Sequence, residues 1–202
     1  MNSKRIIFGT AAVLVASVAL VGCSGTNTTP GGNSGSASTS SPAANASFNM
    51  ADVQFVAMML PHHKPAVAMS DAILAKTDIN PAITALAQQI KAEQQPEIDT
   101  MNSWLKKWNV DMTSMTDSGM GGMGGMNGMM SDSDMTKLDS ATGVEASRLF
   151  LEGMTTHHSG AIDMAETEIK NGKDPDAIAL AKSIKTAQTA EIATMKDLLA
   201  QL

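Results

Sequence analysis

Two adjacent histidine pairs are the residues of this sequence best suited to chemistry. His62-His63 and His157-His158 account for all four histidines of the chain, and a methionine precedes each pair by three and four residues. On a helix this spacing places the methionine on the same face as the histidines. Imidazole nitrogen suits copper, and thioether sulfur selects its reduced form, so the pattern predicts a metal site.

The two histidine pairs belong to an internal duplication. Residues 55–69 match residues 150–164 at a constant offset, and after the loss of one residue 90–101 match 184–195. Self-similarity of this length indicates that one supersecondary unit occurs twice in the chain.

Each half of the duplication contains two segments with helical periodicity, which predicts an all-α fold. Two helical hairpins joined by one long connection are typical of a four-helix bundle. We therefore expect repeat 1 at 50–108, the connection at 109–141 and repeat 2 at 142–202. The four expected helices cover residues 50–76, 81–108, 143–171 and 175–201.

Residues with capping chemistry mark where these helices begin. Asn80 and Asp174 each precede a proline, which places an N-cap acceptor before a proline at the first helical position. Thr142, with Glu145 three residues later, is typical of a capping box. Pro61 lies inside the first segment, and we expect it to kink the helix without ending it.

Heptad spacing predicts which residues face the core. It places one histidine of each pair, His62 and His157, on the core seam, and it gives the second helix of each half a glutamine and a glutamate. Because a buried carboxylate needs a partner or a cation, we expect these glutamates to orient the histidines or to bind metal themselves. The residues with this expected role are Gln94, Glu97, Gln188 and Glu191.

Ten residues on the two repeats are candidate metal ligands. Methionines at helical spacing also suit core packing, so the six methionines in this set fit either role. The candidates are His62, His63, His157, His158, Met59, Met69, Met101, Met154, Met164 and Met195.

The connection between the repeats is rich in methionine and glycine. A glycine-rich loop offers no core for a methionine to fill, so we expect these thioethers to capture a soft ion such as Cu(I). An oxidation sink and a low-complexity drift of the sequence are the alternatives. The methionines of the connection are Met112, Met115, Met120, Met123, Met126, Met129, Met130 and Met135.

The N-terminal residues predict export and lipid anchoring. Residues 1–22 combine a basic start with an apolar run, which is typical of a secretory signal, and they end before Cys23 in a sequence that resembles a bacterial lipobox. Residues 23–47 have the composition of a flexible Ser/Thr/Gly linker, and the folded part covers 48–202. We expect a lipid anchor on the extracytoplasmic face, on the periplasmic or cell-wall side; an ordinary secreted protein is the alternative.

Charge and cysteine content exclude several functions. The formal net charge is −6, and removing the signal with Lys4 and Arg5 makes the chain still more acidic, which argues against a nucleic-acid partner. Cys23 is the only cysteine, so a thiolate metal site and an intramolecular disulfide are both excluded.

The repeated motif resembles the bacterial family known as domain of unknown function 305. Met-x-x-His-His followed by Ala-Val/Ile-x-Met occurs twice, and Glu-Ile-x-x-Met closes each half. The resemblance covers residues 48–202 and implies a ferritin-like four-helix bundle, frequent export and, in some members, copper binding and tolerance. Within this range, the long Met-rich connection is particular to this chain or to a subset of the family. In this chain it is carried by Met59, His62, His63, Met69, Met154, His157, His158 and Met164.

Copper suits this donor set better than zinc or iron. Zinc gains little from methionine, and a di-iron site needs a Glu-x-x-His motif that the sequence lacks. The predicted function is copper sequestration, carriage or tolerance, with metal ions, the membrane, a copper-handling protein and a second copy of the chain as partners. No catalytic motif indicates an enzyme. The alternatives are a copper- or iron-dependent oxidase or peroxide-reactive enzyme, and a metal-free structural or interaction module.

Overall fold

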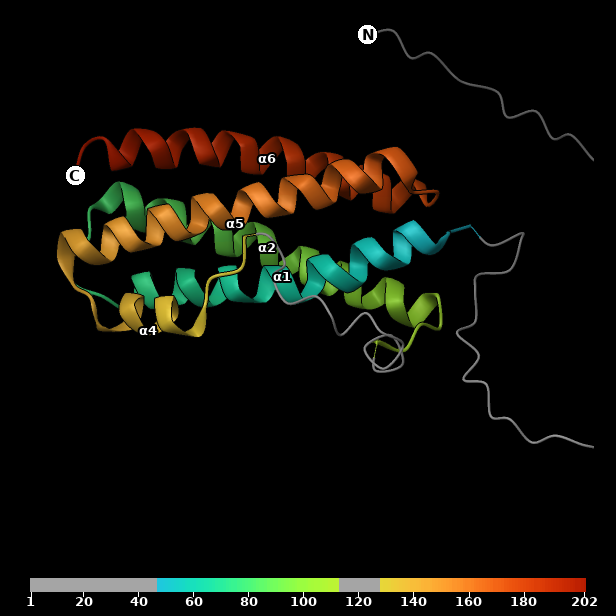
Figure 1. Ribbon diagram of the computed structural model, residues 1–202, viewed down its shortest axis with the longest axis horizontal. Helices are drawn as coiled ribbons and strands as arrows, with labels where there is room; N and C mark the ends of the chain where they lie inside the picture. The colour runs from blue at the N-terminus through green and yellow to red at the C-terminus, as the bar shows by residue number, and fades with distance from the viewer. Residues whose placement is uncertain (1–46, 113–127) are drawn as a thin grey trace, which may run out of the picture. The chain divides into compact units, whose positions relative to one another are not determined.

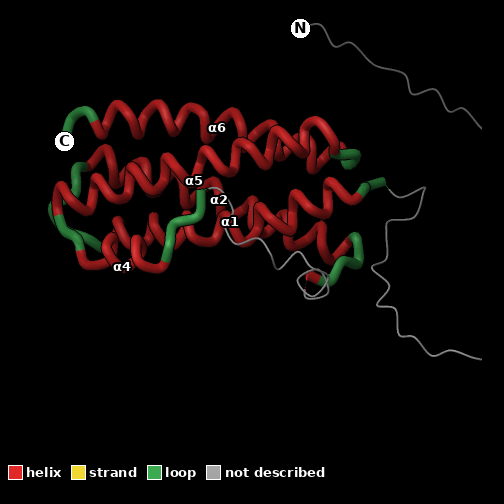
Figure 2. The backbone as a smooth tube through the Cα atoms, in the orientation of Figure 1, coloured by secondary structure: helices red, strands yellow, loops and turns green. Residues whose placement is uncertain are grey.

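The computed structural model describes residues 47–112 and 128–202, and within these ranges the chain is all-helical, without strands (Figure 2). The predicted fold class, all-α, is therefore confirmed. The described residues hold five helices rather than four, because part of the long connection forms a short helix. The helices are α1 (Met50–Leu74), α2 (Pro81–Lys107), α4 (Asp132–Ser140), α5 (Gly143–Asn171) and α6 (Pro175–Leu199).

Two antiparallel hairpins make up the bundle (Figure 1). α1 packs against α2, α5 packs against α6, and α1 and α5 also pack against each other. α2 and α6 touch each other only slightly, so α1 and α5 form the inner pair. The short α4 lies against both inner helices.

Two of the three helix starts predicted from capping chemistry are confirmed, and the third is not. The side chains of Asn80 and Asp174 accept hydrogen bonds from the amides of the first turns of α2 and α6. The capping box predicted at Thr142 is wrong, because Thr142 makes no side-chain cap hydrogen bond. Gly143 directly after it has a φ of +55°, which is not the geometry of a helical first turn. A capping box forms instead at Asn49, which starts α1.

α1 continues through two prolines. Pro61 does not end the helix, as expected, and Pro65 also lies inside it. Each proline removes one backbone hydrogen bond, but α1 packs against two long helices, and this tertiary packing stabilises the helix in spite of the loss.

The apolar core consists of two clusters. The first core cluster joins the start of α1 to the end of α2 and to the α5–α6 turn region. The second core cluster joins the end of α1 to the start of α2, to α4 and to the start of α5. The seam positions that heptad spacing predicts for α1 are all buried, which confirms that part of the prediction; they are Phe55, Met59, His62, Ala66, Met69 and Ile73.

The Met-rich connection contributes to this core, contrary to expectation. Met112 packs against the first core cluster, and Met130 and Met135 pack against the second. The prediction that its methionines have no core to fill is therefore wrong for these three, because the ends of the connection lie against the bundle. Met129 is 38% exposed. Met115, Met120, Met123, Met126, Cys23 and the predicted signal lie outside the described residues.

No helix within the described ranges has both the length and the apolar character needed to cross a membrane.

Candidate metal centre

The two histidine pairs meet at the middle of the bundle. His62 and His63 lie halfway along α1, His157 and His158 lie halfway along α5, and all four side chains are fully buried. The rings of His62 and His157 are in contact, with centroids 3.7 Å apart and an interplanar angle of 35°. We call these four residues the histidine layer.

Heptad spacing placed only one histidine of each pair in the core, and this prediction is incomplete. Both members are buried because each inner helix packs against two partners and therefore has two buried faces. A heptad seam describes a helix with one buried stripe, so it misses the second face.

A glutamate from the same hairpin holds one histidine of each pair. His63 Nε2 lies 2.8 Å from Glu97 Oε2, and His158 Nε2 lies 2.7 Å from Glu191 Oε2. The carboxylate accepts, so Nε2 carries the hydrogen in each ring. A carboxylate that fixes the tautomer and orientation of an imidazole is the usual outer partner of a metal-binding histidine.

His157 is held differently but presents the same nitrogen. Its Nε2 donates to the carbonyl oxygen of His62 at 2.6 Å, and a carbonyl can only accept. Burial lowers the pKa of His157 well below 6.5, and the neighbouring His62 lowers it further, so the ring is neutral at physiological pH.

Three buried imidazoles therefore expose a nitrogen lone pair to the interior. Nδ1 of His63, His157 and His158 is buried and has no hydrogen-bond partner within the described part of the chain. With Nε2 protonated in each ring, Nδ1 is an acceptor and a potential metal ligand. Buried polar atoms without a partner are rare in folded proteins, and three in one layer require an explanation.

The two seam glutamines are also buried but are not bonded to the histidines. Neither polar atom of the Gln94 side chain, nor Oε1 of Gln188, has a hydrogen-bond partner among residues 47–112 and 128–202. Both glutamines lie three residues before a glutamate of the histidine layer, Glu97 or Glu191. The atoms named above make no hydrogen bond within the described residues that would orient a histidine.

The six candidate methionines form two triads on opposite sides of the histidine layer. Met59 and Met101 of repeat 1 join Met164 of repeat 2 in the first core cluster, and the second core cluster holds the matched set, Met69, Met154 and Met195. Each triad draws two members from one repeat and one from the other because α1 and α5 run antiparallel. Five of the six are fully buried, and Met164 is partly exposed.

Nitrogen and oxygen ligands alone do not form a complete metal site. Among the described residues, no three His, Cys, Asp or Glu side chains come together in a way that could hold a metal ion. A metal bound at the histidine layer must therefore take a further donor from elsewhere, and the nearest side chain with a donor atom in both directions along the seam is a methionine.

A second buried polar cluster lies at one end of the bundle and was not predicted. Asp52 accepts hydrogen bonds from the amides of Asn49, Lys173 and Asp174, which ties the start of α1 to the α5–α6 turn. Glu168 is 1% exposed, and burial, together with the neighbouring Asp52 carboxylate, raises its pKa to about 8. One feature of the sequence could have indicated this cluster: Glu168 stands at the position that matches the core residue Ile73 of repeat 1.

The fold and the site together define a duplicated helical bundle with a buried histidine layer braced by carboxylates. The chain belongs to the DUF305 family, whose sequence profile matches residues 52–199. The resemblance noted in the sequence is thereby confirmed. No curated protein matches this sequence.

Solved structures of the family are similar to this one. A DUF305 protein from Streptomyces coelicolor is 34% identical over 75% of this chain and 93% of its own, with a TM-score of 0.67. A DUF305 fragment from Deinococcus radiodurans is 27% identical over 75% and 97%, with a TM-score of 0.64. CopM in its Cu(II)-bound form is 31% identical over 74% and 96%, with a TM-score of 0.63, and CopM is also known in Cu(I)-bound and Ag-bound forms.

Proposed function

We propose that this chain is an exported, lipid-anchored copper-binding protein that sequesters or carries copper and has no catalytic activity. The observation that carries the proposal is the set of buried Nδ1 atoms on His63, His157 and His158 that have no hydrogen-bond partner among the residues the structure describes. Each of these rings is fixed through its other nitrogen, so the lone pairs are pre-oriented ligands that no residue of the described part of the chain uses.

The donor set favours copper over zinc. Because imidazoles and carboxylates do not complete a site, thioether sulfur from the flanking methionine triads must supply the remaining ligands. Methionine sulfur selects Cu(I), whereas imidazole suits Cu(II), so a layer of histidine between two methionine triads can hold copper in both oxidation states.

The relatives support this choice of metal. CopM covers most of the same fold and is known with Cu(I), Cu(II) and silver bound. We extend copper binding from CopM to this chain, and with it a kinship of the fold to ferritin-like four-helix bundles.

Export and anchoring rest on the N-terminal sequence. We place the mature protein on the extracytoplasmic face, held by a lipid on Cys23 and a linker up to residue 47. Expression in a bacterium fed a labelled fatty acid tests this: the wild type is expected to carry label in the membrane fraction. A Cys23→Ser variant that remained labelled would contradict the proposal.

Equilibrium dialysis with Cu(I), Cu(II) and Zn(II) tests the metal site. A His63→Gln/His158→Gln variant, which keeps hydrogen-bonding side chains beside Glu97 and Glu191, is expected to lose Cu(II) binding and to bind less Cu(I), while its far-ultraviolet circular dichroism stays helical. Lys64→Gln/Ser159→Gln, which changes the exposed neighbours of the same histidines, is the matched control. Unchanged copper binding in the histidine variant would overturn the proposed site.

The rival functions predict different results in the same samples. A copper- or iron-dependent oxidase shows turnover with oxygen or peroxide, whereas a carrier takes up metal only stoichiometrically. A metal-free module melts at the same temperature with and without a chelator, whereas a copper-binding protein is stabilised by its ligand.

A further inference from the structure

The last residues of the Met-rich connection run directly against α5. Gly128 has a φ of +94°, and a Cβ atom there would lie 2.8 Å from the carbonyl oxygen of Thr156 and 3.0 Å from that of His157. Only glycine allows the chain to approach the helix backbone this closely with this backbone angle. The connection is therefore seated on the helix turn that carries a histidine of the layer.

A second glycine admits a methionine from the connection into the bundle. At Gly153 of α5, a Cβ atom would lie 2.1 Å from Cε of Met130, 3.8 Å from its sulfur and 3.7 Å from the sulfur of Met69. The thioethers of Met130 and Met69 thus approach the same point from the connection and from α1. The matched residue in repeat 1 is Met58, so Met130 supplies a thioether where the helix of repeat 2 has no side chain.

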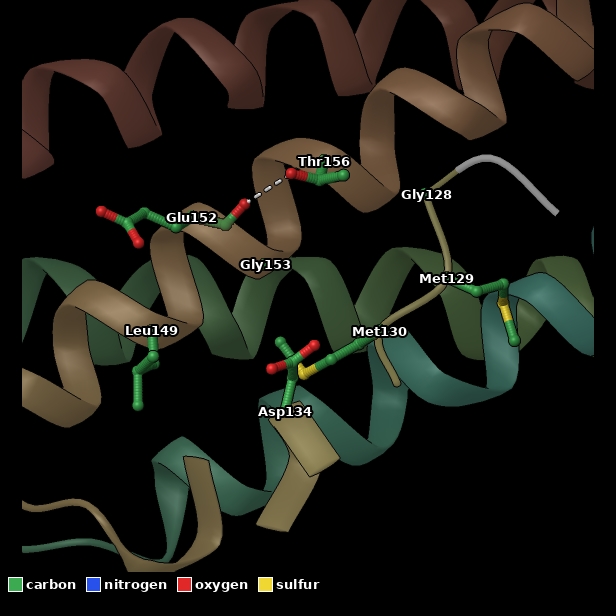
Figure 3. A pocket seen from close by; sticks show the side chains of 8 residues that line it. All are labelled: Gly128, Met129, Met130, Asp134, Leu149, Glu152, Gly153 and Thr156. Carbon is green, nitrogen blue, oxygen red and sulfur yellow. Dashed lines mark hydrogen bonds between the residues drawn. The ribbon is translucent and has the colours of Figure 1, made fainter. Parts of the chain in front are cut away.

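A surface pocket of about 240 Å³ opens at this position (Figure 3). Met130 reaches into it from the connection, and Met129 points away from Met130. The carboxylates of Asp134 and Glu152 belong to its lining, and Glu152 is exposed to solvent. Because Asp134 is paired with Lys137 at 2.8 Å, the exposed Glu152 is the acidic group that raises the local concentration of cations here.

We propose that Met130, which lines this pocket, and Met69, which is fully buried beside Gly153, form a site for a soft monovalent cation, Cu(I) or Ag(I). This surface site is separate from the histidine layer. The inference rests on the proposed function in taking copper as the cargo. Met69 belongs to the same core cluster as Met154, which precedes His157 by three residues, so sulfur atoms lead from this pocket toward the layer. The connection therefore links the two repeats and also places the thioether of Met130 against the bundle as a metal ligand.

The test is a titration of the full chain, labelled with 13C at the methionine methyl groups, with Ag(I), a redox-inert soft cation. The methyl signals of Met130 and Met69 are expected to shift together. In Met130→Leu, which keeps an apolar side chain but lacks sulfur, the Met69 shift is lost and the chain binds one equivalent of Ag(I) fewer. Met50→Leu, which removes an exposed methionine outside the pocket, is the matched control and keeps both.

Gly153→Ala provides an independent variant. Its methyl group takes the space of the Met130 Cε atom, which is the end of a flexible side chain, so Met130 is displaced while the fold and melting temperature are kept. We expect the same loss of one equivalent as in Met130→Leu. Full retention of Ag(I) stoichiometry in both variants would overturn the surface site.

The histidine signals separate the failure of this site from the failure of the proposed function. If Ag(I) shifts the imidazole resonances but leaves Met130 and Met69 unmoved, the surface site is overturned and the histidine layer still binds. If Met130 and Met69 respond and the imidazoles do not, the surface site is supported and the proposed centre is contradicted.

Discussion

The two repeats agree at the middle of the bundle and differ at its ends. In the middle, both carry a His-His pair, a glutamate on one of its rings and three of the six methionines that form the triads. At one end, Asp52 and Glu168 make a buried polar cluster. The matched residues at the other end are Ser147 and Ile73, and Ile73 is part of an apolar cluster.

This difference distinguishes residues expected to bind metal from residues that only stabilise the fold. Features present in both copies are the ones that a metal site requires, because a site between antiparallel helices needs ligands from each. The ends face different surroundings: one meets the α5–α6 turn and the other meets α4. Substitutions at the ends are therefore expected to change stability, and those in the middle to change metal binding as well.

The largest expected effect is the pH dependence of the unfolding free energy that arises from Glu168, at one end of the bundle. Its pKa is raised from 4.5 to about 8, so the folded chain holds a proton that the unfolded chain releases, and stability falls as pH rises through this window. The loss is up to roughly 4 kcal/mol. Glu168→Gln, compared with the wild type by urea unfolding at pH 5 and pH 9, removes this slope. Identical slopes for the two proteins would show that Glu168 does not titrate in this range.

Asp52 does not interfere with that measurement. Burial acts to raise its pKa, but the Glu168 side chain and the amides of Asn49, Asp174 and Lys173 together lower it below 3.8. Its contribution is present above pH 3.8 and is lost only as the pH falls through the lowered pKa, outside the window of Glu168.

Truncation of matched core methionines probes the symmetry of the middle. Met59→Ala and Met154→Ala each remove a fully buried side chain, and each is expected to cost about 3 kcal/mol of unfolding free energy. Met59→Leu and Met154→Leu keep the volume and are expected to cost less than about 1.5 kcal/mol. Urea denaturation measures all four. A large cost in one repeat with almost none in the other would break the equivalence of the repeats.

The two glutamates of the histidine layer are expected to differ in size of effect. The Glu191 side chain is 4% exposed and that of Glu97 is 17% exposed. Removing Glu191 leaves His158 without an acceptor in a dry site, at about 2 kcal/mol, whereas water replaces part of the Glu97 contact, at about 1 kcal/mol. Thermal unfolding of Glu191→Ala and Glu97→Ala compares them. A greater cost for Glu97 would contradict the burial argument.

The smallest expected effect is at Thr155, whose match in repeat 1 is Leu60. Its hydroxyl donates to the carbonyl oxygen of Leu151 at 2.7 Å and lies 3.7 Å from the sulfur of Met195. Thr155→Val is expected to cost about 0.5 kcal/mol, since it removes a hydrogen bond within the helix and a weak contact to sulfur. A cost several times larger would indicate that the sulfur contact orders the second methionine triad.

Much of the fold follows from the sequence because the duplication shows the same periodicity twice. The all-α class, the N-caps at Asn80 and Asp174 and the buried seam of α1 were predictable from local chemistry. The helix in the connection was not, since α4 is short and packs mainly through Leu138 on the inner helices. Local propensity carries little information about a helix that tertiary packing stabilises.

The candidate site was predictable in residue type and not in arrangement. The sequence places histidine, glutamate and methionine at matched positions, but it does not show that α1 and α5 are the inner pair. That packing buries His63 and His158 and divides the methionines into two triads across the repeats. It also lets the end of the connection reach α5 at Gly128 and Gly153, which no periodic pattern in the sequence indicates.

We expect Nδ1 of the buried histidines to be the metal-binding atom. Nitrogen-15 NMR of the histidine side chains, before and after addition of Cu(I) without oxygen, tests it directly. We expect His63, His157 and His158 to carry their hydrogen on Nε2 in the metal-free chain, and the Nδ1 signals to shift on metal binding while Nε2 stays protonated. Nδ1 signals that stay in place at saturating Cu(I), or rings protonated on Nδ1 before metal is added, would contradict it.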